Sequence, residues 1–116
     1  MRGANSKRIY ERYPIDIRVT LSVFRAGVKH DFWGRTSDLG EKGIAATVTG
    51  NLEVGEIVSM RFVVLDAAFD ATACVQYRRG CFCGFEFLKM STEHLQQLKK
   101  TCEQLRSVSA AVTPEY

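Results

Sequence analysis

The sequence predicts a mainly β domain, a small six-stranded antiparallel barrel followed by one C-terminal α-helix. Two patterns carry this prediction. Between residues 14 and 87, short runs of alternating apolar and polar residues are separated by turn residues, which is typical of half-buried strands. From residue 91 onward, the apolar residues recur at helical spacing instead. At 116 residues, the chain has the length of one domain with its own core.

The clearest strand follows Pro14. Every second residue from Ile15 to Val23 is apolar and the residues between them are polar, so one face of this strand is expected to be buried. Ala26-Gly27 supplies a hairpin turn. The other strands are expected at residues 30–36, 44–48, 57–65, 69–77 and 81–87. Branched and aromatic residues dominate the run 57–65, which predicts a more deeply buried strand there.

Glycines mark the connections between these strands. Residues 38–43 contain Gly40 and Gly43, and they predict a turn. Further turns are expected near residues 50–55, 66–68 and 79–80.

The C-terminal region predicts an amphipathic helix over residues 91–106. Leu95, Leu98, Cys102 and Leu105 fall on one helical face, and Ser91 is the candidate N-cap. The predicted organisation is therefore a flexible arm at residues 1–13, a barrel plus helix at 14–106, and a frayed tail at 107–116.

Composition favours a soluble protein with an anionic small ligand. The chain is 46% hydrophobic and 25% charged, with a net charge of +3. This charge falls short of the basic stripe of a duplex binder, so no DNA or RNA is expected. The N-terminus lacks a signal-peptide pattern and no apolar run is long enough to span a bilayer, so we expect a cytoplasmic protein without membrane insertion.

Neither metal binding nor catalysis is expected. The four cysteines, at positions 74, 81, 83 and 102, are expected to be reduced and buried rather than bridged. Cys81 and Cys83 lack the two-residue spacer of common zinc sites, and His30 and His94 belong to no ligand-spaced motif. The sequence contains no nucleophile elbow, phosphate loop or histidine beside a nucleophile, so we expect no enzyme, no metal and no cofactor.

Ligand binding has more support from two short segments. Arg8 and Arg12 lie in the expected arm, and an arginine fork can bond phosphate oxygens or the O6 and N7 acceptors of guanine. Asp38 is a complementary acceptor for guanine N–H donors, and glycines at 40 and 43 would let backbone approach a ligand closely. Taken singly, each segment is more often exposed surface than a binding site.

The order of the segments resembles the PilZ domain family. Arg-x-x-x-Arg is followed by a strand near Pro14 and then by Asp-x-Gly-x-x-Gly. The resemblance continues through residues 43–45, 52–58 and 84–87 and the terminal helix, and it covers roughly residues 7–105. It implies a six-stranded β-barrel that binds the bacterial second messenger cyclic di-GMP.

The resemblance also implies roles for single residues. Arg8 and Arg12 would belong to an arm that folds over the ligand, Asp38 would accept hydrogen bonds from guanine, and Gly43 would be a turn residue. Lys7 would add a phosphate contact. Ligand binding would order the arm and change the surface offered to an unidentified protein partner.

One position departs from the family pattern. The second motif of the family usually reads Asp/Asn-x-Ser-x-x-Gly, and Gly40 stands in the serine position. The missing hydroxyl is worth about 0.5–1.5 kcal/mol as a net hydrogen bond, which is up to roughly tenfold in affinity. This departure motivates an alternative, a degenerate PilZ-like adaptor that acts by protein contacts without binding nucleotide. Fold analogy alone leaves a third hypothesis, a barrel that binds single-stranded nucleic acid.

Overall fold

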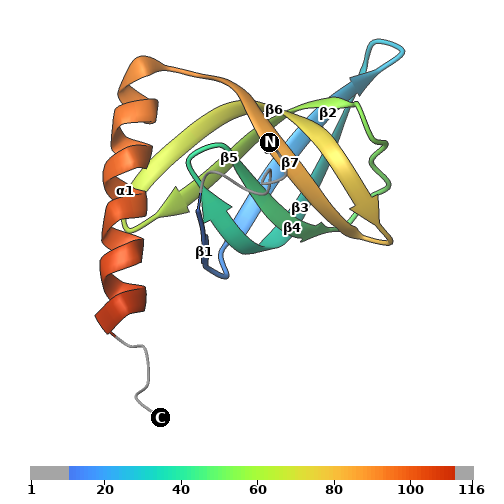
Figure 1. Cartoon of the computed structure of the whole chain (residues 1–116). Coiled ribbons are helices and arrows are strands. Elements are labelled where there is room, and N and C mark those ends of the chain that lie inside the picture. Colours follow the sequence, from blue (N-terminus) through green and yellow to red (C-terminus); the bar gives the residue numbers. More distant parts are fainter. Residues whose placement is uncertain (1–10, 112–116) are drawn as a thin grey trace, which may run out of the picture.

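The computed structural model describes the backbone of residues 11–111 and the side chains of residues 11–107, so Lys7 and Arg8 lie outside the described residues. Strands make up most of this region, and one helix follows them (Figure 1). The elements are β1 Arg12–Pro14, β2 Arg18–Arg25, β3 Val28–Gly40, β4 Gly43–Val48, β5 Ile57–Val64, β6 Ala67–Arg79, β7 Phe82–Met90 and α1 Thr92–Ala111.

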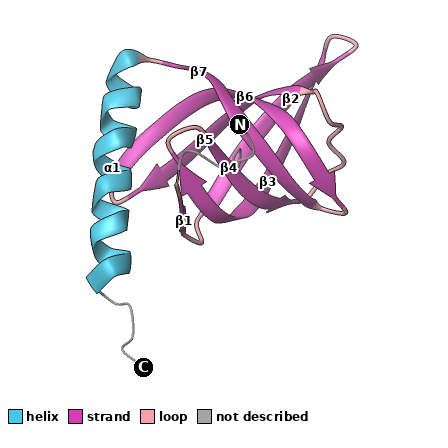
Figure 2. Ribbon diagram, viewed as in Figure 1, coloured by secondary structure: helices cyan, strands magenta, loops and turns pink. Residues whose placement is uncertain are grey.

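Six antiparallel strands close into a barrel (Figure 2). Their order is β3-β2-β5-β6-β7-β4, and pairing between β3 and β4 completes the ring. Closure leaves no free edge among these six strands. The short β1 pairs with the last residues of β3, beyond the point where β2 pairing stops. The predicted barrel with a C-terminal helix is therefore confirmed.

The core fills the barrel interior with alternate residues of the strands. Phe62, Phe69 and Phe85 are its largest fully buried side chains, and Phe62 stacks on Phe69 with ring centroids 5.2 Å apart. The predicted deep burial of residues 57–65 is wrong, because Ile57 and Val63 are about half exposed. Buried and exposed residues alternate along β5, so one face of the strand lies in the core and the other faces outward.

Helix α1 stands at one end of the barrel (Figure 1). Leu98, Cys102 and Leu105 are buried in the core, and Ser91 caps the helix because its Oγ accepts a hydrogen bond from the His94 N–H at 3.0 Å. The helix continues to Ala111, past the predicted end at residue 106, so the tail expected from 107 is helical in its first part. No glycine or proline interrupts the sequence between the cap and Pro114, which explains the longer helix.

Two predicted boundaries near the N-terminus also differ from the structure. Arg12 and Tyr13, assigned to the arm, lie in β1 and pair with β3. Residues 38–40, assigned to a turn, belong to β3, so the bend contains only Glu41 and Lys42. The end of β3 stays extended because β1 pairs on one edge and β4 on the other. A register shift at Ser37 adjusts the pairing with β4.

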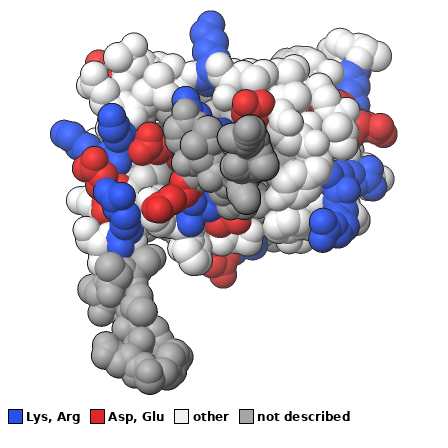
Figure 3. Space-filling model, viewed as in Figure 1, with Lys and Arg blue, Asp and Glu red and all other residues white. Residues whose placement is uncertain are grey.

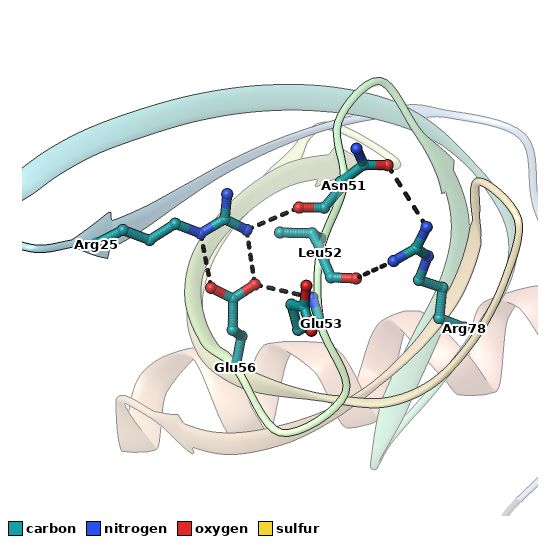
Figure 4. Close-up of polar contacts among 6 residues, drawn as sticks. All are labelled: Arg25, Asn51, Leu52, Glu53, Glu56 and Arg78. Carbon is teal, nitrogen blue, oxygen red and sulfur yellow. Dashed lines mark hydrogen bonds and ion pairs between the residues drawn. The ribbon is translucent and has the colours of Figure 1, made fainter.

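The loop between β4 and β5 lies away from α1 and is fastened by two arginines (Figure 4). Arg25 binds both carboxylate oxygens of Glu56 at 2.7 Å and donates to the Asn51 carbonyl at 2.7 Å. Arg78 donates to the Leu52 carbonyl at 3.2 Å. The hydrogen bond from Arg25 holds the pKa of Glu56 below its usual value. These arginines therefore hold the loop onto the barrel.

Candidate functional site

Strand β1 brings Arg12 to Asp38. In the β1–β3 pairing, Arg12 lies opposite Gly40 and Pro14 opposite Asp38, so the two charged residues are diagonal neighbours. Arg12 Nη1 donates to Asp38 Oδ1 at 2.6 Å, and the two side chains are 22% and 31% exposed. Two predicted site residues, 26 positions apart in the sequence, thus meet at the surface.

Gly40 and Gly43 lie beneath the Arg12 side chain. A Cβ on Gly40 would lie 2.5 Å from the Glu11 carbonyl oxygen and 2.9 Å from Arg12 Cδ. A Cβ on Gly43 would lie 2.3 Å from the Phe85 carbonyl oxygen and 3.2 Å from Arg12 Nη2. Both positions therefore need glycine for the close approach of neighbouring chain segments. From the sequence, both glycines are expected to let backbone approach a ligand, and Gly40 to cost a hydroxyl; their role in making room for neighbouring segments of the protein itself was not predicted.

Thr36 secures β1 at the site, and sequence reasoning did not single it out. Its hydroxyl donates to the Ile15 carbonyl at 2.6 Å and accepts from the Ile17 N–H at 3.0 Å. Thr36 is only 4% exposed, so these bonds bridge the break between β1 and β2 from inside the fold. Threonine is common in strands, and no sequence signal distinguishes this one.

Beyond the bond that joins them, Arg12 can donate further hydrogen bonds and Asp38 can accept further ones. Among the described residues, the bond to Asp38 is the one hydrogen bond of Arg12, so the rest of its guanidinium fork can donate to a ligand. A carboxylate can accept several hydrogen bonds, and Asp38 uses one position for Arg12. Such a pair suits a partner with an anionic group or ring acceptors beside N–H donors.

The chain matches a known domain family over most of its length. The family model described as "PilZ domain" matches residues 6–104, which is most of the chain. The chain belongs to the PilZ domain family. No curated protein sequence matches this PilZ domain.

Solved PilZ structures share its fold. The PilZ domain of CeSA from a cellulose-synthesizing bacterium is 19% identical with a TM-score of 0.60, and the match covers 85% of this chain and 98% of that one. The PilZ domain of YcgR from Escherichia coli, solved with cyclic di-GMP, is 16% identical with a TM-score of 0.68, covering 94% and 99%.

A third structure is longer than this PilZ domain. The Bacillus subtilis inhibitor of motility MotI is 14% identical with a TM-score of 0.69 over 89% of this chain. The match covers 52% of MotI, so this chain spans about half the length of that protein. At these identities, the three likenesses show a shared fold.

In this PilZ domain, β1 also connects the site to the helix. The Tyr13 hydroxyl donates to Glu11 Oε1 at 2.8 Å, and burial followed by this bond raises the pKa of Tyr13. The charge of Arg106 on α1 acts on Tyr13 in the opposite direction. Cys102 of α1 is buried, which raises its pKa to about 11, and the charge of Glu41 adds to this shift.

Other predictions concern features away from the site. The four cysteines are free, and Cys83 and Cys102 are buried, but the expected burial is wrong for Cys81, which is exposed, and for Cys74, which is only half-buried. In the described part of the chain, no three His, Cys, Asp or Glu residues are grouped to hold a metal ion. No helix among the described residues is long and apolar enough to cross a membrane. Of the described site residues, none of Arg12, Asp38, Gly40 and Gly43 lines a surface hollow of about 770 Å³ over β2, β5 and β6.

Proposed function

We propose that this PilZ domain is a non-catalytic receptor for cyclic di-GMP. The meeting of Arg12 and Asp38 over two glycines is the observation that carries the proposal. Counting bonds to the described residues, it presents at one place on the barrel surface a guanidinium with unused donors and a carboxylate with unused acceptor positions. Family membership and the cyclic di-GMP bound to the YcgR domain add support.

In the proposed complex, each charged residue takes one part of the nucleotide. Asp38 accepts from the N1–H and N2–H₂ donors of guanine, and Arg12 donates to a phosphate or to the O6 and N7 acceptors. Arg8 lies four positions before Arg12, and it contacts the opposite side of the ligand. Lys7 adds a phosphate contact. The residues before β1 become ordered over the ligand, and this changes the surface available to a protein partner.

The position of Gly40 favours binding in this proposal. The absent side chain leaves space for the Glu11 carbonyl and for Arg12, which can then lie flat over the end of β3. The lost hydroxyl costs at most one neutral hydrogen bond, whereas Arg12 and Asp38 supply the stronger charged ones.

Calorimetric titration with cyclic di-GMP tests this function. The wild-type chain should bind saturably, and Asp38→Ala should weaken binding about tenfold or more, because a charged hydrogen-bond acceptor is lost. Asp70→Ala is the matched control, since Asp70 also pairs with an arginine, Arg61, but lies on another part of the barrel. No heat of binding at high concentrations of wild-type protein and ligand would refute the proposal.

The alternative is a PilZ-like adaptor that no longer binds nucleotide. One observation favours it: Arg12 and Asp38 are already bonded to each other at 2.6 Å in the protein alone, and this bond joins β1 to β3 without any ligand. Under this alternative, the titration gives no signal and Asp38→Ala lowers the thermal midpoint by separating β1 from β3.

A further inference from the structure

The outer face of the barrel carries the hollow of about 770 Å³ that lies apart from the proposed nucleotide site. Residues of β2, β5 and β6 line it, together with the end of β7 and the start of α1, which follows β7 directly (Figure 1). Small-molecule sites typically have volumes of roughly 300–1,000 Å³. Five lining residues carry a hydroxyl group: Thr20, Ser22, Ser59, Thr72 and Ser91. The hollow therefore has the size and polarity to hold a small polar ligand.

Strand pairing places several of these polar residues in one row. Ser22 of β2 lies opposite Ser59 of β5, and Ser59 lies opposite Thr72 of β6. Thr72 in turn lies opposite Lys89 of β7, because a register shift skips Leu88. Neighbouring strands are about 4.8 Å apart, so the row follows a path of about 14 Å across four strands. Three hydroxyls thus lead to one ammonium group.

Most polar groups of this row are available to a ligand. Within residues 11–107, no hydrogen bond or ion pair engages the side chain of Ser59, Thr72 or Lys89. Ser22 Oγ donates to Asp31 Oδ1 at 3.0 Å, and its oxygen can still accept a hydrogen bond. The row therefore offers both donors and acceptors.

The β7 end of the row favours an anionic group. Arg61 and Asp70 both line the hollow and neutralise each other, with Arg61 Nε at 2.9 Å from Asp70 Oδ1. Among the described lining residues, this leaves the charge of Lys89 uncompensated. His94 Nδ1 accepts a hydrogen bond from the Asp70 N–H at 3.3 Å, so Nε2 of the neutral ring carries the proton and can donate.

We propose that this hollow binds a free sugar phosphate. The phosphate lies at the β7 end and accepts hydrogen bonds from Lys89, Thr72 and His94, of which the bond from the ammonium group is the strongest. The sugar lies along the strands, where its hydroxyls exchange hydrogen bonds with Ser59 and Ser22, since hydroxyl groups both donate and accept. This site is separate from the proposed nucleotide site, so both ligands can be bound at once.

An NMR titration of the full chain with glucose 6-phosphate tests the proposal. Backbone amide signals around Ser59, Thr72 and Lys89 should shift saturably. Lys89→Gln should weaken binding about tenfold, because the phosphate loses a charged hydrogen bond. Lys99→Gln is the matched control, since Lys99 is exposed on α1 and does not line the hollow, and it should bind like the wild type. No saturable shift in the wild type, or equal binding by Lys89→Gln, would overturn the proposal.

A second comparison tests the placement of the sugar. Ser59→Ala should weaken binding of glucose 6-phosphate about threefold through loss of one neutral hydrogen bond, and it should leave the affinity for inorganic phosphate unchanged. Ser37→Ala, which removes an exposed hydroxyl from β3, should change neither affinity. Inorganic phosphate that binds as tightly as glucose 6-phosphate, or a Ser59→Ala variant that binds glucose 6-phosphate like the wild type, would overturn the assignment of the hydroxyl row to a sugar.

Discussion

Arg12 and Arg25 both reach a carboxylate across the barrel surface, but the structure uses the two guanidiniums differently. Arg25 makes two bonds of 2.7 Å to Glu56 and a third of 2.7 Å to the Asn51 carbonyl (Figure 4). Within the described part of the chain, Arg12 makes a single bond of 2.6 Å, to Asp38. Counting bonds to residues 11–107, Arg25 uses most of its hydrogen-bond donors within the protein, and Arg12 keeps most of its donors.

This difference separates a structural pair from a candidate binding pair. Glu56 also accepts from the Glu53 N–H at 2.9 Å, so the Arg25 cluster fastens a loop through a closed set of bonds. Arg12 lies over glycines and beside an acceptor with remaining capacity. Charges of both signs are spread over the face shown in Figure 3, so charge alone does not single out the site. The number of unused hydrogen-bonding groups is the better guide.

Exchanging the two arginines for alanine should give opposite results. Arg12→Ala should weaken cyclic di-GMP binding about 100-fold, because the nucleotide loses an arginine that donates two hydrogen bonds to it in the proposed complex. Adding Arg8→Ala should abolish binding. Arg25→Ala should leave the affinity unchanged and lower the thermal midpoint, because the loop after β4 loses its fastening. Calorimetry and thermal unfolding of both variants check this. A binding loss in Arg25→Ala with none in Arg12→Ala would reverse the assignment.

Substitution of Gly40 tests two explanations for this glycine. It either makes room for Glu11 and Arg12 or merely lacks the hydroxyl of the serine in the family pattern. Gly40→Ser should weaken ligand binding about tenfold, because its Cβ would displace the Glu11 carbonyl and with it Arg12. If the glycine only lacks a hydroxyl, the serine would instead strengthen binding. Ser37→Ala is the control, since it removes an exposed hydroxyl from the same strand. Titration of both variants gives the sign of the effect.

Acid should weaken the hydrogen bonds that join Arg25 to Glu56. The pKa of Glu56 is lowered in the folded protein, chiefly by the hydrogen bond from Arg25. A lowered carboxyl pKa contributes stability that is present above the ordinary value of 4.5 and is lost as the pH falls through the folded value. Between pH 7 and pH 3, unfolding midpoints of the wild type should therefore fall more steeply than those of Glu56→Gln. Glu103→Gln, on the exposed face of α1, should follow the wild type.

The smallest expected effect concerns the contact between β1 and the helix. Cys81 should react first with a thiol reagent because it is exposed, whereas Cys102 should react slowly because burial raises its pKa to about 11. Arg12→Ala loosens β1 and should modestly accelerate labelling of Cys102, while Arg25→Ala should not. Time-resolved mass spectrometry measures both rates. Equal acceleration by the two variants would mean that β1 does not shield the helix.

The sequence was sufficient for the barrel and the helix because alternating and helical periods are set by local burial. It also selected Arg12 and Asp38, and the structure places them in contact. The end of β3 could not be predicted, since Asp38 to Gly40 remain extended through pairing with two strands that are distant in the sequence. The packing role of Gly40 was missed for the same reason, because it depends on the backbone of Glu11.

In the proposed function, Arg12 and Asp38 bind a guanine nucleotide. The most direct test is calorimetric titration of the full chain with cyclic di-GMP beside cyclic di-AMP. We predict saturable binding of cyclic di-GMP and at least about tenfold weaker binding of cyclic di-AMP, whose adenine lacks the N1–H and N2–H₂ donors that Asp38 would accept. Equal affinity for both nucleotides, or binding of neither, would contradict the account.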